Sequence, residues 1–235
     1  MDSKRARLDI SILLSVAFIL GAPAIVSAQA RSLADAYQII ASKQFVDLTH
    51  SFSPLTPVWK GFGPATFSAA ADPATGRPYT IDHDGFRAQF FAMVGQYGTH
   101  IDPPAHFDSA GATVDEIPVK QMILRLVVFD LTPMLKSDPN HLLTVEDIEV
   151  WEQMHGRVPA GSFAALRTDM YKDWDSNRAR FERYPFPAWS PAAIRFLYEQ
   201  RGIVANGQTS RWIRTRPQTS SLRAGCSSMV IGKSR

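Results

Sequence analysis

Residues 96–107, with the sequence QYGTHIDPPAHF, constrain the fold more than any other stretch of this chain. His100 and Asp102 lie two positions apart, so in an extended strand both side chains leave the same face and can reach one cation. Two consecutive prolines follow, and they remove two backbone donors and fix two φ angles. His106 is therefore presented from a stiffened bend. The stretch predicts a functional site where a strand meets a rigid loop.

The three polar side chains have the chemistry of a metal site. Imidazole and carboxylate groups together suit zinc or manganese. His106 could instead take or give a proton, because the ordinary pKa of histidine is near neutral. An isolated His-x-Asp pair is also typical of a surface turn or a helix N-cap, and for the pair alone this alternative stays open. The prolines and the second histidine favour the metal site.

The segment GTHIDPPAHF resembles the signature of the metal-dependent cyclase family, which includes bacterial kynurenine formamidases and isatin hydrolases. The resemblance implies that His100 and Asp102 bind a divalent ion, zinc or manganese, and that His106 is the catalytic acid/base. Gln96 stands where the family has its first histidine, and it is the third implied ligand, although an amide is a poorer zinc ligand than imidazole. Trp59 is the implied substrate contact, or else an interior tryptophan that anchors its loop.

Residues 1–30 have the pattern of a secretory signal peptide. Basic residues precede an apolar run over 10–20, and small residues end the segment at Ala30. Cleavage there would leave no stable membrane anchor, and we expect a periplasmic or secreted protein; a retained N-terminal anchor is the alternative. The single cysteine, Cys226, excludes an internal disulfide framework.

Helical and strand patterns alternate over residues 31–204, which predicts one mixed α/β domain. Helices are predicted where an N-cap precedes an apolar stripe, and strands where β-branched or aromatic residues run together. The predicted helices span 31–43, 144–156 and 190–202, and the predicted strands 45–50, 86–94, 124–132 and 162–168. The third of these strands is predicted to be buried, and a long loop over 61–85 could cover a site. The family resemblance implies a swivelling β/β/α domain with a mixed sheet.

Residues 205–235 differ from the rest of the chain in charge. They contain six Lys and Arg but no Asp or Glu. Residues 1–204 therefore have 19 of the 25 basic residues and all 22 acidic ones, which gives a formal charge of −3. The basic excess belongs to this tail, and we expect no nucleic-acid binding by the body. A tail that contacts anionic lipid or nucleic acid is the alternative. The resemblance stops near residue 207, and a shifted reading frame would explain a C-terminal part that is lost or altered.

Two classes of function follow. The first is a metal-dependent amidohydrolase that acts on a small formamide or cyclic amide. The resemblance implies a kynurenine formamidase, which converts N-formylkynurenine to kynurenine and formate in tryptophan catabolism, or a relative. The second is an inactive or non-catalytic periplasmic binding descendant of the family. Either would have a small molecule as its partner. The oligomeric state stays open, with a homodimer as one alternative.

Overall fold

The computed structural model describes residues 32–51, 53–58, 60–208 and 228–231. The predicted signal peptide therefore lies outside the described residues. The chain divides into two compact units, residues 1–48 and 49–235. In the first unit, helix α1 (Leu33–Ala41) begins with a capping box, in which Ser32 and Asp35 satisfy each other's backbone N–H groups. This confirms the helix predicted at the start of the domain.

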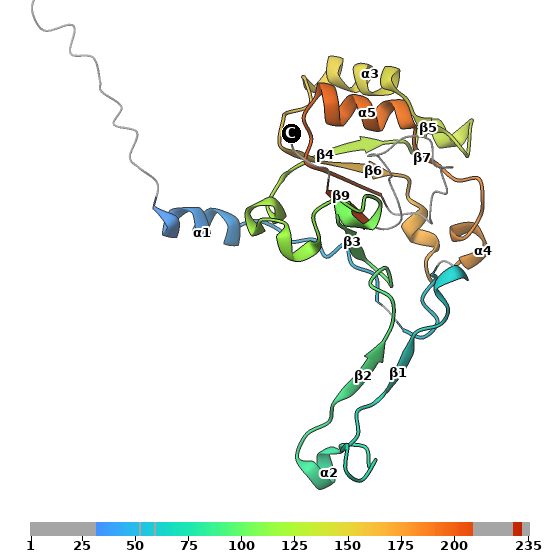
Figure 1. The fold of residues 1–235 in the computed structure, drawn as a ribbon. Helices are drawn as coiled ribbons and strands as arrows, with labels where there is room; N and C mark the ends of the chain where they lie inside the picture. The colour runs from blue at the N-terminus through green and yellow to red at the C-terminus, as the bar shows by residue number, and fades with distance from the viewer. Residues whose placement is uncertain (1–31, 52, 59, 209–227, 232–235) are drawn as a thin grey trace, which may run out of the picture. The chain divides into compact units, whose positions relative to one another are not determined.

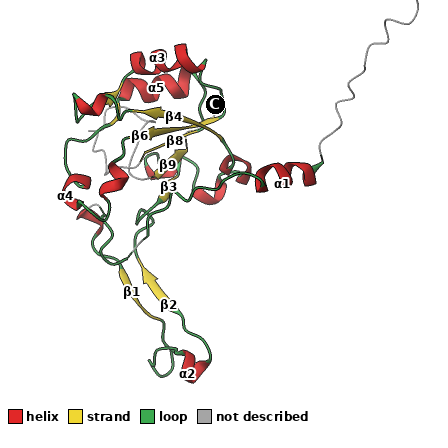
Figure 2. Cartoon of the chain, turned by 180° about the vertical axis from the view of Figure 1, so that it is seen from behind, coloured by secondary structure: helices red, strands yellow, loops and turns green. Residues whose placement is uncertain are grey.

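The second unit contains the remaining elements, which Figures 1 and 2 show from opposite sides. Three sheets are present among its described residues: a two-stranded hairpin, a five-stranded sheet and a short two-stranded sheet. The strands are β1 (Thr66–Ala69), β2 (Gln89–Ala92), β3 (His100–Asp102), β4 (Arg125–Asp130), β5 (Leu142–Leu143), β6 (Ser162–Arg167), β7 (Ala188–Trp189), β8 (Ala205–Gln208) and β9 (Ser228–Ile231). The helices are α2 (Ile81–Asp84), α3 (Val145–His155), α4 (Arg178–Phe181) and α5 (Pro191–Gln200).

The five-stranded sheet has the order β3-β9-β8-β6-β4 and is mixed, as predicted. Strands β4, β6 and β8 run parallel, β9 runs antiparallel to β8, and β3 runs parallel to β9. The carboxyl ends of β4, β6 and β8 therefore lie at the same edge as the start of β3. In open α/β sheets this edge is where ligands bind. The topology places His100 at that edge.

Helices α3 and α5 lie side by side over one face of this sheet (Figures 1 and 2). Each begins at a hydroxyl N-cap: the Thr144 hydroxyl accepts a hydrogen bond from the N–H of Asp147, and the Ser190 hydroxyl one from the N–H of Ala193. The main apolar core fills the space between helices and sheet, and its buried members include Val127, Phe129, Ile148, Leu166 and Leu197. This layer fixes the sheet on which the site is built.

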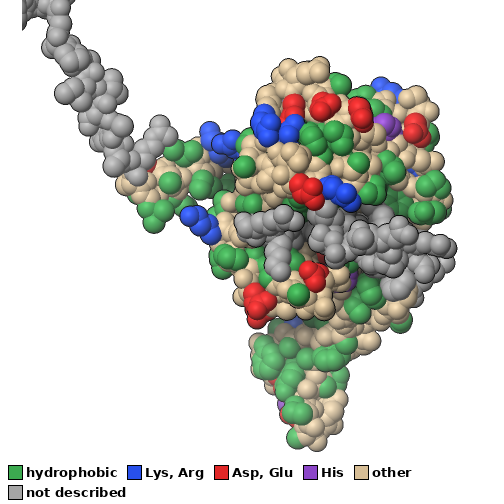
Figure 3. Space-filling view, turned by 45° about the horizontal axis from the view of Figure 1, so that its top comes forward, with side chains coloured by type: hydrophobic (Ala, Val, Ile, Leu, Met, Phe, Trp, Pro, Cys, Tyr) green, Lys and Arg blue, Asp and Glu red, His purple; other side chains and the backbone are tan. Residues whose placement is uncertain are grey.

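The hairpin of β1 and β2 is antiparallel and has apolar side chains on its surface. Phe90 and Phe91 on β2, and Ile81 on α2, are exposed. Figure 3 shows hydrophobic side chains, in green, on this part of the molecule. None of the helices that the structure describes is both long enough and apolar enough to cross a bilayer.

The sequence predicted several elements correctly and missed others. The helices over 144–156 and 190–202 and the strand over 162–168 are confirmed. The strand predicted over 45–50 is wrong, because β-forming residues make a strand only beside a pairing partner, and the described residues provide none there. The strand predicted over 124–132 is present as β4, but the prediction that it is buried is wrong: β4 is an edge strand, and Leu126 on its far face is exposed.

The tail predicted from residue 205 begins inside the main sheet. Residues 205–208 form β8, which is buried between β6 and β9, and residues 228–231 form β9. The sheet therefore continues past residue 204. The intervening residues 209–227 lie outside the described part of the chain, so the altered reading frame stays a prediction.

Candidate functional site

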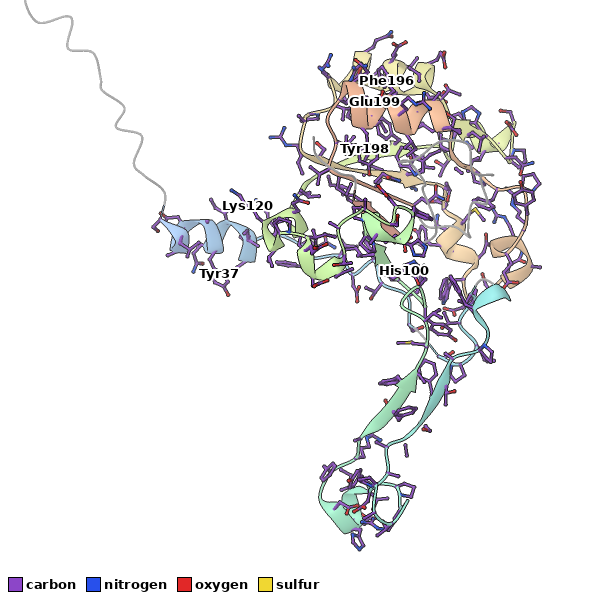
Figure 4. The ribbon with its side chains drawn as sticks, in the orientation of Figure 1. Tyr37, His100, Lys120, Phe196, Tyr198 and Glu199 are labelled. Carbon is purple, nitrogen blue, oxygen red and sulfur yellow. The ribbon has the colours of Figure 1, made fainter. Side chains whose placement is uncertain are left out.

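Strand β3 carries the first two residues of the predicted site. His100 and Asp102 alternate with Ile101 and share one face of the strand, as their spacing predicted. The chain enters β3 through Gly98, whose φ of 73° is favoured only by glycine. The Gly98 carbonyl accepts a hydrogen bond of 2.8 Å from Nδ1 of His100. Figure 4 shows His100 at the start of this strand.

This hydrogen bond determines the tautomer of His100. A carbonyl oxygen can only accept, so Nδ1 carries the proton and Nε2 of the neutral ring keeps a free lone pair. Nε2 is buried and makes no hydrogen bond within the described part of the chain. Metal-binding histidines are typically held in this way, with the other ring nitrogen donating to a carbonyl or carboxylate. The ring of His100 is therefore prepared to bind a cation.

Asp102 is the centre of the cluster and is only 1% exposed. Three nitrogens surround its Oδ1: Nε2 of His100 at 3.4 Å, Nε2 of Gln96 at 3.4 Å and Nε2 of His106 at 3.9 Å. Burial alone would lower the pKa of His100, but the Asp102 carboxylate and the Gly98 carbonyl outweigh this effect and raise the pKa. The structure thus brings together the four motif residues that the sequence singled out.

The bend between Asp102 and His106 is short and braced. Residues 104–106 form one 3₁₀ turn after an extended proline, and the N–H of His106 donates to the Pro103 carbonyl at 2.9 Å. Gly111 packs against this turn so closely that a Cβ atom there would lie 2.5 Å from the carbonyl carbon of Pro104. The turn returns His106 to the side of Asp102, which explains why the four-residue spacing still gives proximity.

Gln96 lies between Asp102 and His106. Its Nε2 is 3.4 Å from Oδ1 of Asp102 and 3.3 Å from Nδ1 of His106. An ionised carboxylate accepts only, so the amide presents its N–H groups to this pair. Nδ1 of His106 is then an acceptor, and the proton of the neutral ring lies on Nε2. In this geometry Gln96 acts as a donor that orients two neighbours, while its predicted role as a metal ligand stays a prediction.

The spacing of His100 and Asp102 fits a divalent ion. Two ligands bound at about 2.1 Å in a tetrahedral site lie about 3.4 Å apart, and Nε2 of His100 and Oδ1 of Asp102 are separated by 3.4 Å. Within the described residues, no group of three or more His, Cys, Asp or Glu side chains is arranged to hold an ion. The described residues therefore supply two well-placed ligands, and they define no third one.

The residue before His100 contacts His50, which the motif did not indicate and which stacks on a distant tryptophan. The ring of His50 stacks on Trp174 with 4.1 Å between centroids, and the backbone N–H of His50 donates to the Thr99 hydroxyl at 3.1 Å. Burial lowers the pKa of His50, although Asp175 partly offsets this effect. One weak indication of this contact was present in the sequence, because Trp174 is a lone tryptophan in a charged stretch. Trp59, the predicted substrate contact, lies outside the described residues.

A second buried polar pair lies on the same sheet face. The hydroxyl of Tyr198, on α5, donates to Oδ1 of Asn206, on β8, at 2.9 Å. Figure 4 shows Tyr198 below α5, on the side of the sheet. Burial raises the pKa of Tyr198 far above its ordinary range, so the hydroxyl keeps its proton. The strand register places Asn206 and Asp102 in one row, both beside position 230 of β9.

Known proteins resemble this chain over the same region. An isatin hydrolase of Roseibium aggregatum is 33% identical over 134 residues, which cover 51% of this chain and 49% of the relative. The chain thus matches about half the length of this curated relative. The solved structure of isatin hydrolase A from Ralstonia solanacearum has a TM-score of 0.63 at 26% identity, over 77% of this chain and 73% of that one.

A further solved structure, of a potential metal-dependent hydrolase with cyclase activity, has the same fold at 20% identity. Its TM-score is 0.51, over 79% of each chain. These likenesses confirm the predicted mixed α/β fold of the cyclase family. The family model described as "Putative cyclase" matches residues 46–208, which include every described residue of the site. The chain therefore belongs to this family of hydrolase-type enzymes, as its motif predicted.

Proposed function

We propose that this protein is a metal-dependent hydrolase that opens a small cyclic amide. The observation that carries the proposal is the buried cluster around Asp102, in which two imidazole Nε2 atoms lie 3.4 and 3.9 Å from one carboxylate oxygen. The similarity to isatin hydrolases supports a cyclic amide rather than an open-chain formamide as the substrate. Zinc and manganese both suit the imidazole and carboxylate donors.

His100 and Asp102 would hold the ion, because their donor atoms have the right separation and Nε2 of His100 makes no hydrogen bond in the described part of the chain. A divalent ion held there would supply Lewis-acid chemistry for the scissile carbonyl and for an attacking water. The burial of Asp102 keeps its charge poorly screened, which strengthens its attraction for a cation.

His106 would move the proton. Gln96 holds Nδ1 of His106 as an acceptor, so the ring presents Nε2 toward Asp102 and the interior of the cluster. A proton on Nε2 can be delivered to the nitrogen that leaves when the amide C–N bond breaks. This position and this tautomer support the role of His106 as a general acid.

Hydrolysis assays on the purified full chain test the proposal. We expect the chain to hydrolyse isatin when loaded with zinc or manganese, and N-formylkynurenine more slowly. The change His106→Gln keeps a polar side chain but removes the transferable proton, and it should lower kcat by about a hundredfold or more. The metal content, measured by mass spectrometry, should stay unchanged in this variant.

The matched control is His155→Gln, which changes an exposed histidine in the last turn of α3. It should leave kcat within about twofold of the original value. Equal kcat values for the original chain and His106→Gln would remove the proposed proton transfer. A chain that binds metal but hydrolyses neither substrate would instead support the second function, a non-catalytic binding protein. The lack of a third described ligand is the observation that favours this alternative.

A further inference from the structure

Gln208, the last residue of β8, buries an unpaired amide. Its side chain is 6% exposed, and neither Nε2 nor Oε1 has a hydrogen-bond partner in the described part of the chain. Most buried side-chain amides are hydrogen-bonded, because an unpaired donor or acceptor loses its bonds to water without replacement. An amide that is unpaired at both atoms therefore indicates a group that binds there from outside the chain.

The other amide on the same strand is paired. Asn206 lies two positions before Gln208, faces the same side of the sheet and is also buried, but its Oδ1 accepts a hydrogen bond from Tyr198. The fold can thus satisfy a buried amide on β8, and it does so at one position only. The Asn206 amide therefore has a structural role, whereas the Gln208 amide is left without one.

The strand register places Gln208 beside the site. Gly207 of β8 lies opposite Met229 of the antiparallel β9, so the next pair in register is Gln208 with Ser228, and Ser228 lies opposite His100. Paired residues on neighbouring strands point to the same face of a sheet. Two strand spacings put the backbones of His100 and Gln208 about 10 Å apart. The two side chains therefore leave the same face of the sheet, on strands separated by β9 alone.

We infer that Gln208 recognises the amide of a cyclic substrate, an inference that rests on the function proposed above. A primary carboxamide presents one acceptor, Oε1, and donors on Nε2, side by side. A lactam presents the complementary pair, because its ring holds the N–H and the C=O cis to each other. Oε1 accepts the substrate N–H, and Nε2 donates to one lone pair of the substrate carbonyl. The second lone pair of that carbonyl stays free for a cation.

This pairing distinguishes cyclic from open-chain amides. An open-chain secondary amide is almost always trans, so its N–H and C=O point in opposite directions and cannot both meet one carboxamide. Gln208 therefore favours lactams over N-formyl compounds. Gln208 forms and breaks no covalent bond in the reaction, so it is a specificity residue rather than a proton donor.

The test compares isatin with N-methylisatin, in which a methyl group replaces the N–H. Dissociation constants of both compounds are measured by calorimetry on the metal-loaded full chain and on Gln208→Leu, which keeps the side-chain size, both in the His106→Gln background so that isatin is not hydrolysed during the measurement. We expect the original chain to bind isatin about tenfold more tightly than N-methylisatin. In Gln208→Leu the two compounds should bind within about twofold of each other. A tenfold preference that persists in Gln208→Leu would overturn the inference, since steric exclusion of the methyl group would then explain it.

Thermal stability gives a readout that does not depend on activity. Gln208→Leu should keep or raise Tm, because it removes an unpaired buried amide, whereas Asn206→Leu should lower Tm, because it removes the buried hydrogen bond between Oδ1 of Asn206 and the Tyr198 hydroxyl. A large fall in Tm for Gln208→Leu would show a structural role and overturn the inference. Failure of the original chain to hydrolyse isatin would contradict the proposed function, while the binding preference would still decide the role of Gln208.

Discussion

The two halves of the five-stranded sheet bury opposite kinds of side chain on the same face. Under α3 and α5, strands β4 and β6 contribute Phe129 and Leu166 to the apolar core. Farther along the face, β3 and β8 contribute Asp102, Asn206 and Gln208, which are equally buried but polar. Apolar burial stabilises the fold, whereas burial of a carboxylate and an unpaired amide reduces stability. The comparison shows which part of the sheet serves folding and which part serves binding.

The largest expected effect of a single substitution is on the polar half. Asp102→Asn keeps the shape of the side chain and removes its charge, and we expect it to lower kcat/KM by more than about a hundredfold, since even the loss of a residue behind a metal ligand costs 10- to 100-fold. Bound metal, measured by mass spectrometry, should fall in parallel. The matched control is Asp130→Asn at the end of β4, a half-exposed carboxylate paired with Arg167. Metal retained in full by Asp102→Asn would contradict the assignment of this ligand.

The next effect is on the apolar half and concerns stability instead of activity. Leu197 on α5 is 0% exposed, so Leu197→Ala leaves a cavity and should lower the free energy of unfolding by about 2–5 kcal/mol. Leu126→Ala on the open face of β4 is the control, because that side chain is 53% exposed and should cost about 1 kcal/mol or less. Urea denaturation measures both values. An equal loss of unfolding free energy in the two variants would mean that the far face of the sheet is covered in solution.

The smallest expected effect concerns the capping box of α3. Thr144→Ala removes the hydroxyl that caps the helix and should cost about 1 kcal/mol at neutral pH. Burial raises the pKa of Asp147, but hydrogen bonds from Thr144 and His141 outweigh it and lower the pKa below its ordinary value. A carboxylate whose pKa is lower in the folded chain than in the unfolded chain stabilises the fold at pH values above the unfolded-state pKa. This stabilisation is lost as the pH falls through the folded-state pKa.

The difference in stability between the original chain and Thr144→Ala should therefore shrink as the pH falls below about 4, because the Asp147 carboxylate loses its charge there. Thermal unfolding followed by circular dichroism from pH 7 to pH 3 checks this. A difference in Tm that stays constant over the whole range would mean that the hydroxyl contributes without the carboxylate.

Local signals predicted the parts of the fold that local chemistry determines. The N-caps at Thr144 and Ser190 correctly located α3 and α5, and the spacing of His100 and Asp102 correctly placed them on one face. These features depend on residues a few positions apart, so the sequence contains them directly. The family match over residues 46–208 then confirmed the resemblance that the motif had indicated.

Features that depend on distant contacts were not predictable in this way. The burial of Trp174 against His50 joins segments more than a hundred residues apart, and nothing in either segment indicates the other. The exposure of Leu126 depends on β4 being an edge strand, which follows from the order of the whole sheet. Gln208 looked like part of a basic tail, and only the register of β8 and β9 brings it to the site.

The position of β9 has a consequence for synthesis. Among the described strands it is the last in the chain, yet it lies between β3 and β8 and provides the hydrogen bonds that attach β3 to the rest of the sheet. A ribosome completes the His100 strand more than a hundred residues before this neighbour is made. The His100 strand can therefore join the sheet only after β9 has been made.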